Sequence, residues 1–145
     1  TPPMKLHLRI LQLVVALSLT LAVSVVLSRA ESPDRAPLIN RGRYLVENVG
    51  LCSDCHTPHN EKGQLVRERL LLGSVLPFAP TVPMPWSPAA PPIAGLPTMT
   101  EAQAVVFLQT GQRPDGSRPR PPMPEFRFDG ADAAAVAAYL KSLAH

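Results

Sequence analysis

Residues 52–56 have the sequence Cys-Ser-Asp-Cys-His, and this pentapeptide constrains the chain more than any other segment. Two thiols three positions apart, followed at once by an imidazole, form the pattern of covalent c-type haem attachment. Cys52 and Cys55 would each bond one haem vinyl group, because one turn of chain between them matches the separation of the two vinyls. His56 would then present a ring nitrogen to the iron as its proximal ligand. The chain has only these two cysteines, so no thiol remains for another purpose.

Three other uses of a Cys-x-x-Cys pair compete with haem attachment. A thioredoxin-like redox pair needs a βαβ context, and this sequence shows no alternation of strand and helix patterns. A zinc site would combine Cys52, Cys55 and His59 with a fourth ligand, but structural zinc sites normally draw on a second ligand pair, which is missing here. A disulfide would close a very short loop and add little stability. Haem attachment is therefore the preferred interpretation.

The sequence of the N-terminal region predicts a membrane segment and export of the rest of the chain. A basic tail, residues 1–9, precedes an apolar run at 10–27. A helix of 18 residues is about 27 Å long, just enough to cross a bilayer. We therefore predict a transmembrane anchor at 10–28, although residues 28–30 (Ser-Arg-Ala) also suit signal cleavage, so a removed signal remains an alternative. Basic residues before the span keep the N-terminus cytoplasmic, which places the rest of the chain in the periplasm, held at the cell inner membrane.

The remaining body of the chain is formally neutral. Of the 14 basic residues, Lys5, Arg9 and Arg29 flank the apolar run, which leaves 11 basic and 11 acidic residues. No basic stretch with interleaved aromatics occurs, so nucleic-acid binding is not supported. After a polar linker at 29–37, we expect one small domain at 38–145. Its apolar content is thin, and a buried porphyrin would supply the missing apolar mass.

Apolar periodicity predicts an all-α domain with three main helices and no strand. The first helix, 38–49, has one apolar face, made of Leu38, Leu45, Val46 and Val49. Glycine inside a helix costs about 1 kcal/mol relative to alanine. The presence of Gly42 therefore indicates a close backbone crossing.

The second and third helices have start and stop signals. Residues 98–101 fit a capping box, Gly111 ends the second helix, and Asp129 is the N-cap of the third. The second helix has the apolar stripe Ala102, Val105 and Val106. The third helix has the buried face Val136, Tyr139, Leu140 and Leu143.

Two proline-rich loops separate these helices. Residues 77–97 hold eight prolines, and 114–124 hold five together with Met123. Because proline fixes φ and lacks an amide proton, both segments must be extended loops. The apolar residues of the first loop (Phe78, Trp86 and Ile93) favour packing on a flat apolar surface over a disordered linker.

Met123 is the best candidate for the second axial ligand of the iron. A methionine sulfur opposite histidine raises the potential of a haem. Met123 is flanked by prolines, which hold its thioether in place at little entropic cost. Met84 is a weaker candidate in the other loop, and Met99 is expected to pack in the core.

The chain resembles the class I c-type cytochromes over residues 38–144. The resemblance lies in four segments: 42–46 (GRYLV), 52–58 (CSDCHTP), 122–124 (PMP) and 138–140 (AYL). It implies that the first and last helices cross at Gly42 against Tyr139. The chain is similar to cytochrome subunits of bacterial membrane-bound dehydrogenases. Its anchor is similar to that of tethered cytochromes that serve oxidases, quinol-oxidising complexes or photosynthetic reaction centres.

The expected function is one-electron transfer by a single covalent haem c, with no catalysis at the iron. With both axial positions filled, no small-molecule substrate reaches the metal. His56 should donate its other ring N–H to a backbone carbonyl of the proline loop. The candidate contacts of the haem propionates are Arg67, Arg69, Arg118, Arg120 and Trp86. The expected partners are a membrane-embedded redox complex and, through the anchor, the bilayer.

Two other functions remain open at this stage. An accessory subunit would mainly secure the assembly of a larger complex. A haem peroxidase-like enzyme would have Met123 displaced from the iron.

Overall fold

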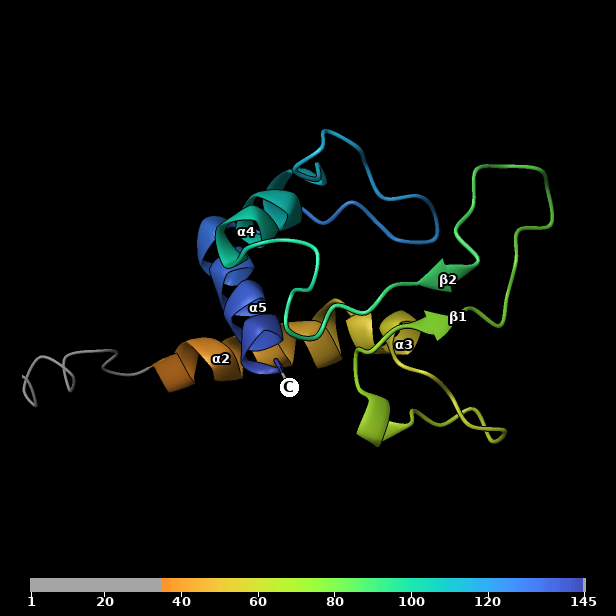
Figure 1. Cartoon of the computed structure of the whole chain (residues 1–145), viewed down its shortest axis with the longest axis horizontal. Coiled ribbons are helices and arrows are strands. Elements are labelled where there is room, and N and C mark those ends of the chain that lie inside the picture. The colour runs from red at the N-terminus through yellow and green to blue at the C-terminus, as the bar shows by residue number, and fades with distance from the viewer. Residues whose placement is uncertain (1–34, 145) are drawn as a thin grey trace, which may run out of the picture. The chain divides into compact units, whose positions relative to one another are not determined.

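The computed structural model describes residues 35–144 and is mostly helical (Figure 1). The predicted anchor lies outside these residues. Within them, no helix combines the length and the apolar character that crossing a bilayer requires. The elements in chain order are α2 (Arg35–Tyr44), η1 (Leu45–Val49), α3 (Cys52–His56), η2 (Arg67–Arg69), β1 (Ser74–Val75), β2 (Ala89–Ala90), α4 (Glu101–Thr110) and α5 (Gly130–Ser142).

The first helix begins earlier than predicted and ends in a wider turn. It starts at Arg35, inside the predicted linker, and its last five residues form the π-helical turn η1. Pro37 is tolerated because the amides of a first turn have no helical partner. Leu45 and Val46 are buried as predicted, but Val49 is exposed. The wider π turn rotates Val49 away from the face that an α-helical period predicts.

The crossing of the first and last helices is confirmed. Gly42 is buried, and a Cβ atom added there would collide with the carbonyl of Ala135 and lie 2.8 Å from the Cβ of Tyr139. Beside this contact, the Arg41 guanidinium donates two hydrogen bonds to the Asp132 carboxylate, each 2.9 Å long. The α2 backbone therefore lies directly against α5.

Helix α4 begins two residues later than predicted. Its N-cap is Thr100, whose side chain and that of Gln103 bond each other's backbone amide in a capping box. A turn from Leu96 to Met99 precedes the helix and occupies the positions where the helix was predicted to begin. The predicted apolar stripe is only partly right: Val105 packs against the core, but Val106 is 54% exposed. Ala102 is exposed as well, and the residues that face α5 are Ala104 and Leu108.

Helix α5 agrees closely with its prediction. Asp129 is the N-cap and accepts a hydrogen bond from the amide of Asp132. Gly111, in the left-handed conformation with φ of 69°, ends the preceding α4 as expected. The buried face of α5 includes Val136, Tyr139 and Leu140, while Leu143 is partly buried at the edge of the core.

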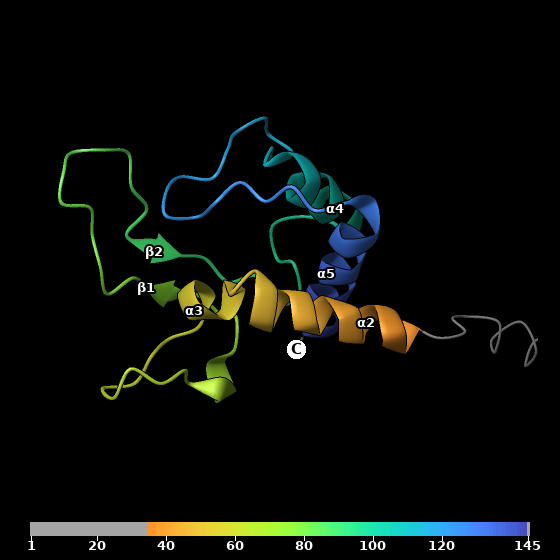
Figure 2. The same cartoon turned by 180° about the vertical axis from the view of Figure 1, so that it is seen from behind.

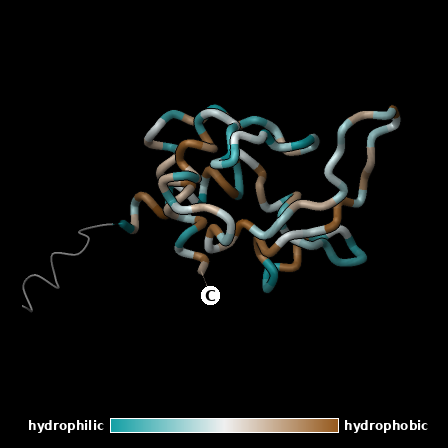
Figure 3. The backbone as a smooth tube through the Cα atoms, turned by 45° about the horizontal axis from the view of Figure 1, so that its top comes forward, coloured by the Kyte–Doolittle hydropathy of each residue, from teal (hydrophilic) through white to brown (hydrophobic). Residues whose placement is uncertain are grey.

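A short hairpin contradicts the prediction that the domain has no strand. Ser74 pairs with Ala90 and Val75 with Ala89 in antiparallel β1 and β2. Two-residue strands give no periodic pattern, so the sequence could not reveal them. The connection between them stands away from the helices in both views (Figures 1 and 2). Figure 3 shows it in pale and brown shades, without a strongly hydrophilic stretch.

Candidate functional site

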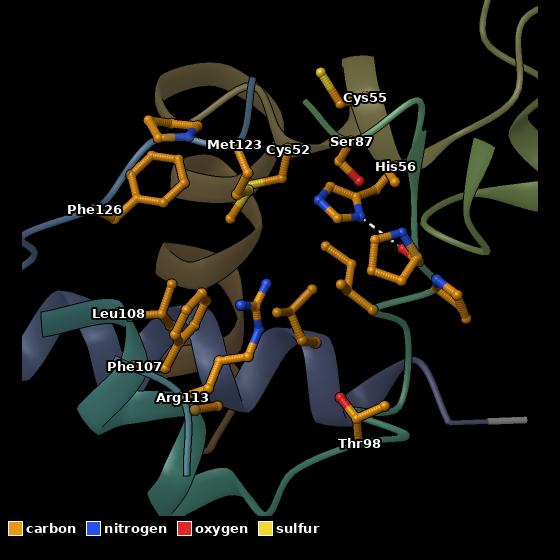
Figure 4. A pocket seen from close by; sticks show the side chains of 18 of the residues that line it. Cys52, Cys55, His56, Ser87, Thr98, Phe107, Leu108, Arg113, Met123 and Phe126 are labelled. Atoms are coloured by element: carbon orange, nitrogen blue, oxygen red, sulfur yellow. Dashed lines mark hydrogen bonds between the residues drawn. The ribbon is translucent and has the colours of Figure 1, made fainter. Parts of the chain in front are cut away.

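One cavity of about 420 Å³ brings together all four residues that the sequence singled out, namely Cys52, Cys55, His56 and Met123. The first three come from α3, directly after the first helix, and Met123 comes from the second proline-rich loop (Figure 4). The remaining walls are largely apolar and include Leu76, Ile93, Leu96, Met99, Ala104, Phe107, Leu108, Phe126, Val136 and Leu140.

The imidazole of His56 is held in one orientation by the first proline-rich loop. It is 5% exposed, and its Nδ1 lies 2.7 Å from the carbonyl oxygen of Pro91. A carbonyl can only accept, so Nδ1 carries the proton and donates, as predicted. Burial lowers the pKa of His56, which keeps the ring neutral. The other ring nitrogen, Nε2, therefore holds a free lone pair, and Figure 4 shows it turned away from Pro91.

Both cysteines are free thiols. Burial raises the pKa of Cys52 to about 11, and burial together with the nearby Asp54 raises the pKa of Cys55. Both sulfurs are therefore protonated at neutral pH. Among residues 35–144, no three His, Cys, Asp or Glu side chains come together as a metal site. The zinc arrangement with His59 is thus not formed, and His59 instead forms a backbone bridge with Leu65.

Met123 lies at the cavity on a short turn. Its amide donates a 3.1 Å hydrogen bond to the carbonyl of Arg120. Figure 4 shows its side chain among those that line the cavity, together with Cys52 and His56. Met84 is exposed and does not line the cavity, whereas Met99 does. A second thioether therefore faces the same space, which the sequence pattern did not indicate.

The polar part of the wall is only partly as predicted. Arg118 and Arg120 line the cavity, but Arg67 and Arg69 do not. Arg67 instead lies 3.4 Å from Glu47 in an ion pair.

Arg113 is a lining residue that the sequence reasoning missed. It is half-buried, its guanidinium carbon lies 5.7 Å from the centre of the Phe107 ring, and Figure 4 shows it reaching into the cavity. No motif surrounds it that could have revealed this role.

Trp86, also predicted as a propionate contact, does not line the cavity, but it carries an unsatisfied group. Its indole Nε1–H is buried, and no described residue accepts a hydrogen bond from it. A buried donor without a partner costs free energy, so a ligand oxygen is the expected acceptor. The neighbouring residue, Ser87, lines the cavity.

These features together suit haem c. They are two thiols, a neutral imidazole with a free nitrogen lone pair, a thioether in the same cavity and largely apolar walls. The profile of the Cytochrome c family matches residues 39–144. This chain belongs to the cytochrome c family. Its members bind haem c covalently and transfer electrons.

One curated cytochrome shares a short stretch with this member of the family. It is named "Diheme cytochrome c-type" and comes from Cereibacter sphaeroides. The two sequences are 50% identical over 44 residues. That stretch is 30% of this chain and 15% of the relative, so the chain spans only a small part of that protein's length.

Proposed function

We propose that this cytochrome c carries one covalent haem and transfers single electrons without catalysing a reaction at the iron. The observation that carries the proposal is the shared cavity of Cys52, Cys55, His56 and Met123. When bound, the haem supplies an iron that cycles between the ferric and ferrous states. Cys52 and Cys55 would hold the haem covalently, since each S–H could add across one vinyl C=C, with the sulfur on one carbon, the hydrogen on the other and no net change of oxidation state.

The protein's own groups fix the ligands and exclude water. The Pro91 carbonyl holds the His56 ring so that Nε2 would be the atom that coordinates the iron, and this hydrogen bond raises the basicity of the ring. Met123 is held between Pro122 and Pro124, which limits the conformations available to it. If His56 and Met123 both held the iron, no coordination position would be left for a substrate.

The haem propionates would lie near the cationic and donor groups of the wall. Arg113, Arg118 and Arg120 line the cavity, and Trp86, which precedes the lining residue Ser87, would supply a further donor through its unpaired Nε1–H. Arg118 forms an ion pair with Glu125 at 2.8 Å, so its positive charge is partly neutralised. Within residues 35–144 the Arg113 guanidinium forms no ion pair and donates a 3.4 Å hydrogen bond to the Ser117 hydroxyl, so it is the best-placed cation.

The haem count follows from the thiols of this chain. The similar protein is named as a dihaem cytochrome, but residues 1–145 contain a single Cys-x-x-Cys-His motif and no other cysteine. These residues therefore supply attachment for one haem.

The location and the partner follow from the N-terminal pattern. The apolar run at 10–27 with basic residues before it favours a tether in the inner membrane, with the domain in the periplasm. A tether confines diffusion to the membrane plane and raises the effective concentration near a membrane partner. We therefore infer that the domain serves a membrane redox complex as a subunit or tethered carrier.

A spectrum with a mass measurement tests the proposal. The purified full chain should have the mass of the polypeptide plus one haem, retained after denaturation. Its reduced form should show the sharp α-band of a low-spin, six-coordinate haem. A colourless protein of polypeptide mass would refute haem attachment, and a high-spin spectrum would refute the closed iron site.

A further inference from the structure

The hairpin of residues 74–90 exposes large apolar side chains. Val75 is 79% exposed and Val82 is 62% exposed, and the side chains of Phe78 and Met84 are exposed as well. Between Arg69 and Glu101 the sequence holds no acidic, basic or histidine residue. An uncharged stretch with this much exposed apolar surface is typical of an interaction site, because single soluble domains rarely leave such surface open.

The hairpin has a fixed shape. The amide of Leu76 bonds the Pro88 carbonyl at 2.9 Å, and the amide of Ser87 bonds the Pro121 carbonyl at 2.8 Å. Phe78 and Trp86 pack edge to face, with ring centres 5.8 Å apart. Six prolines between 77 and 91 further restrict the backbone. A surface that is ordered in advance loses little conformational entropy when a partner binds.

The hairpin is continuous with the haem cavity. Its residues Leu76, Ser87, Ala89 and Ala90 line the cavity together with Cys55. Cys55 itself is only partly buried. A protein that covers the hairpin therefore also covers this edge of the cavity.

We propose that the hairpin is the docking face for a redox protein whose own docking face is apolar and uncharged. This inference rests on the proposed electron transfer. A protein is favoured over lipid because the hairpin borders the cavity that would hold the haem, and an electron carrier must bring a redox partner to that cavity. Contact without charges should depend little on salt.

A second copy of this chain presents such a face and serves as the probe. In a mixture of ferrous and ferric protein, one electron passes from one copy to the other, so one iron is oxidised and one reduced, and no bond changes. The rate of this self-exchange can be measured by NMR on the haem-loaded full chain. In a second, redox-silent measurement on fully ferrous protein, the amide shifts of residues 74–90 should move as the protein concentration rises.

The decisive variant is Val82→Asp with Met84→Asp. Self-exchange should fall about tenfold, a change of about 1.4 kcal/mol in the barrier. The concentration-dependent shifts should disappear as well. The matched control is Ala102→Asp with Val106→Asp, which places two carboxylates on exposed positions of α4. It should change neither measurement by more than about twofold at moderate salt, where charges beyond about 10 Å are screened.

Three outcomes would overturn the docking face: an unchanged rate in the hairpin variant, an equal fall in the α4 control, or a full recovery of the rate in high salt. The last would indicate long-range repulsion instead of lost contact. The haem spectrum separates these results from a failure of the proposed function. A variant with normal haem absorption and unchanged self-exchange refutes docking alone, whereas a chain that binds no haem refutes electron transfer itself.

Discussion

Gly42 lies against the carbonyl of Ala135 with no room for a side chain between them. The two residues are far apart in sequence, and their contact fixes how the first helix crosses α5. Arg41 and Asp132 pair beside it, and Tyr139 packs on its other side. The helix that leads into the haem motif is thereby positioned by the C-terminal helix.

Gly42→Ala should destabilise the haem-loaded protein. The added methyl group would overlap a backbone carbonyl that cannot rotate away, and such overpacking costs about 1–3 kcal/mol. Denaturant unfolding measures the change. Gly130→Ala is the control, because its added Cβ would lie 3.6 Å from the Gln109 side chain, an ordinary contact. Equal unfolding free energies for the two variants would contradict the close crossing.

Thr100→Ala should lower the unfolding free energy by about 1 kcal/mol, the usual value of an N-cap. Its hydroxyl accepts the amide of Gln103 at 3.2 Å, and the Gln103 side chain accepts the Thr100 amide at 2.8 Å. Thr98→Ala should cost less, because Thr98 precedes the helix. A larger loss of unfolding free energy in Thr98→Ala than in Thr100→Ala would indicate that the helix begins at Thr98, as the sequence predicted.

Tyr139→Phe should cost about 1–2 kcal/mol near neutral pH, because it removes a 2.6 Å hydrogen bond to the Glu47 carboxylate. Burial, and then the bond to Glu47, raise the pKa of Tyr139 above its ordinary value of 10.0. A raised pKa means that the phenol contributes its full stability below about pH 10 and loses it as the pH rises further. The difference in unfolding free energy between wild type and variant should therefore be constant below about pH 10 and shrink above it. A difference that grows in alkali would contradict this assignment, and Tyr44→Phe at an exposed position is the control.

Met123→Ala should remove the second axial ligand. The expected result is loss of the low-spin spectrum and a midpoint potential lower by on the order of 0.1 V, within the roughly 0.8 V that axial ligands span. Met84→Ala should change neither property, because Met84 does not line the cavity. Met99→Ala is the sharper control, since Met99 does. If Met99→Ala, and not Met123→Ala, abolished the low-spin spectrum, the ligand assignment would move to Met99.

Trp86→Phe should alter how the midpoint potential depends on pH. The buried Nε1–H is expected to donate to a haem propionate, which favours the anion and keeps the pKa of that propionate low. Phenylalanine retains a ring against Phe78 but has no donor, so the propionate should titrate at a higher pH. An unchanged potential curve would mean that the indole has a different acceptor. Phe78→Leu, which keeps the donor, is the control.

The candidate haem-binding residues could be predicted because residues close together in the sequence form the attachment motif. Cys52, Cys55 and His56 are recognisable from spacing alone, and the crossing at Gly42 followed from the cost of glycine in a helix. The cap at Asp129 followed from side-chain chemistry within one turn. In each case the signal that allowed the prediction lies within a short segment of sequence.

Other features depended on contacts between distant segments. The π turn at η1 shifts the exposed face of the first helix, and no sequence pattern in residues 45–49 predicts this turn. The buried face of α4 is set by packing on α5, which selects Leu108 over Val106. Arg113 lines the cavity because two loops fold over it. No local pattern contains this information.

The cavity occupies the place where a small domain would normally have its densest packing, between α3, α4, α5 and both proline loops. A polypeptide awaiting its porphyrin is therefore hollow at the centre, and its loops have little to rest on. Such an intermediate is open to proteases, whereas the finished protein is closed to them. The amount of this protein that a cell accumulates should consequently follow its supply of haem, even at a constant rate of synthesis.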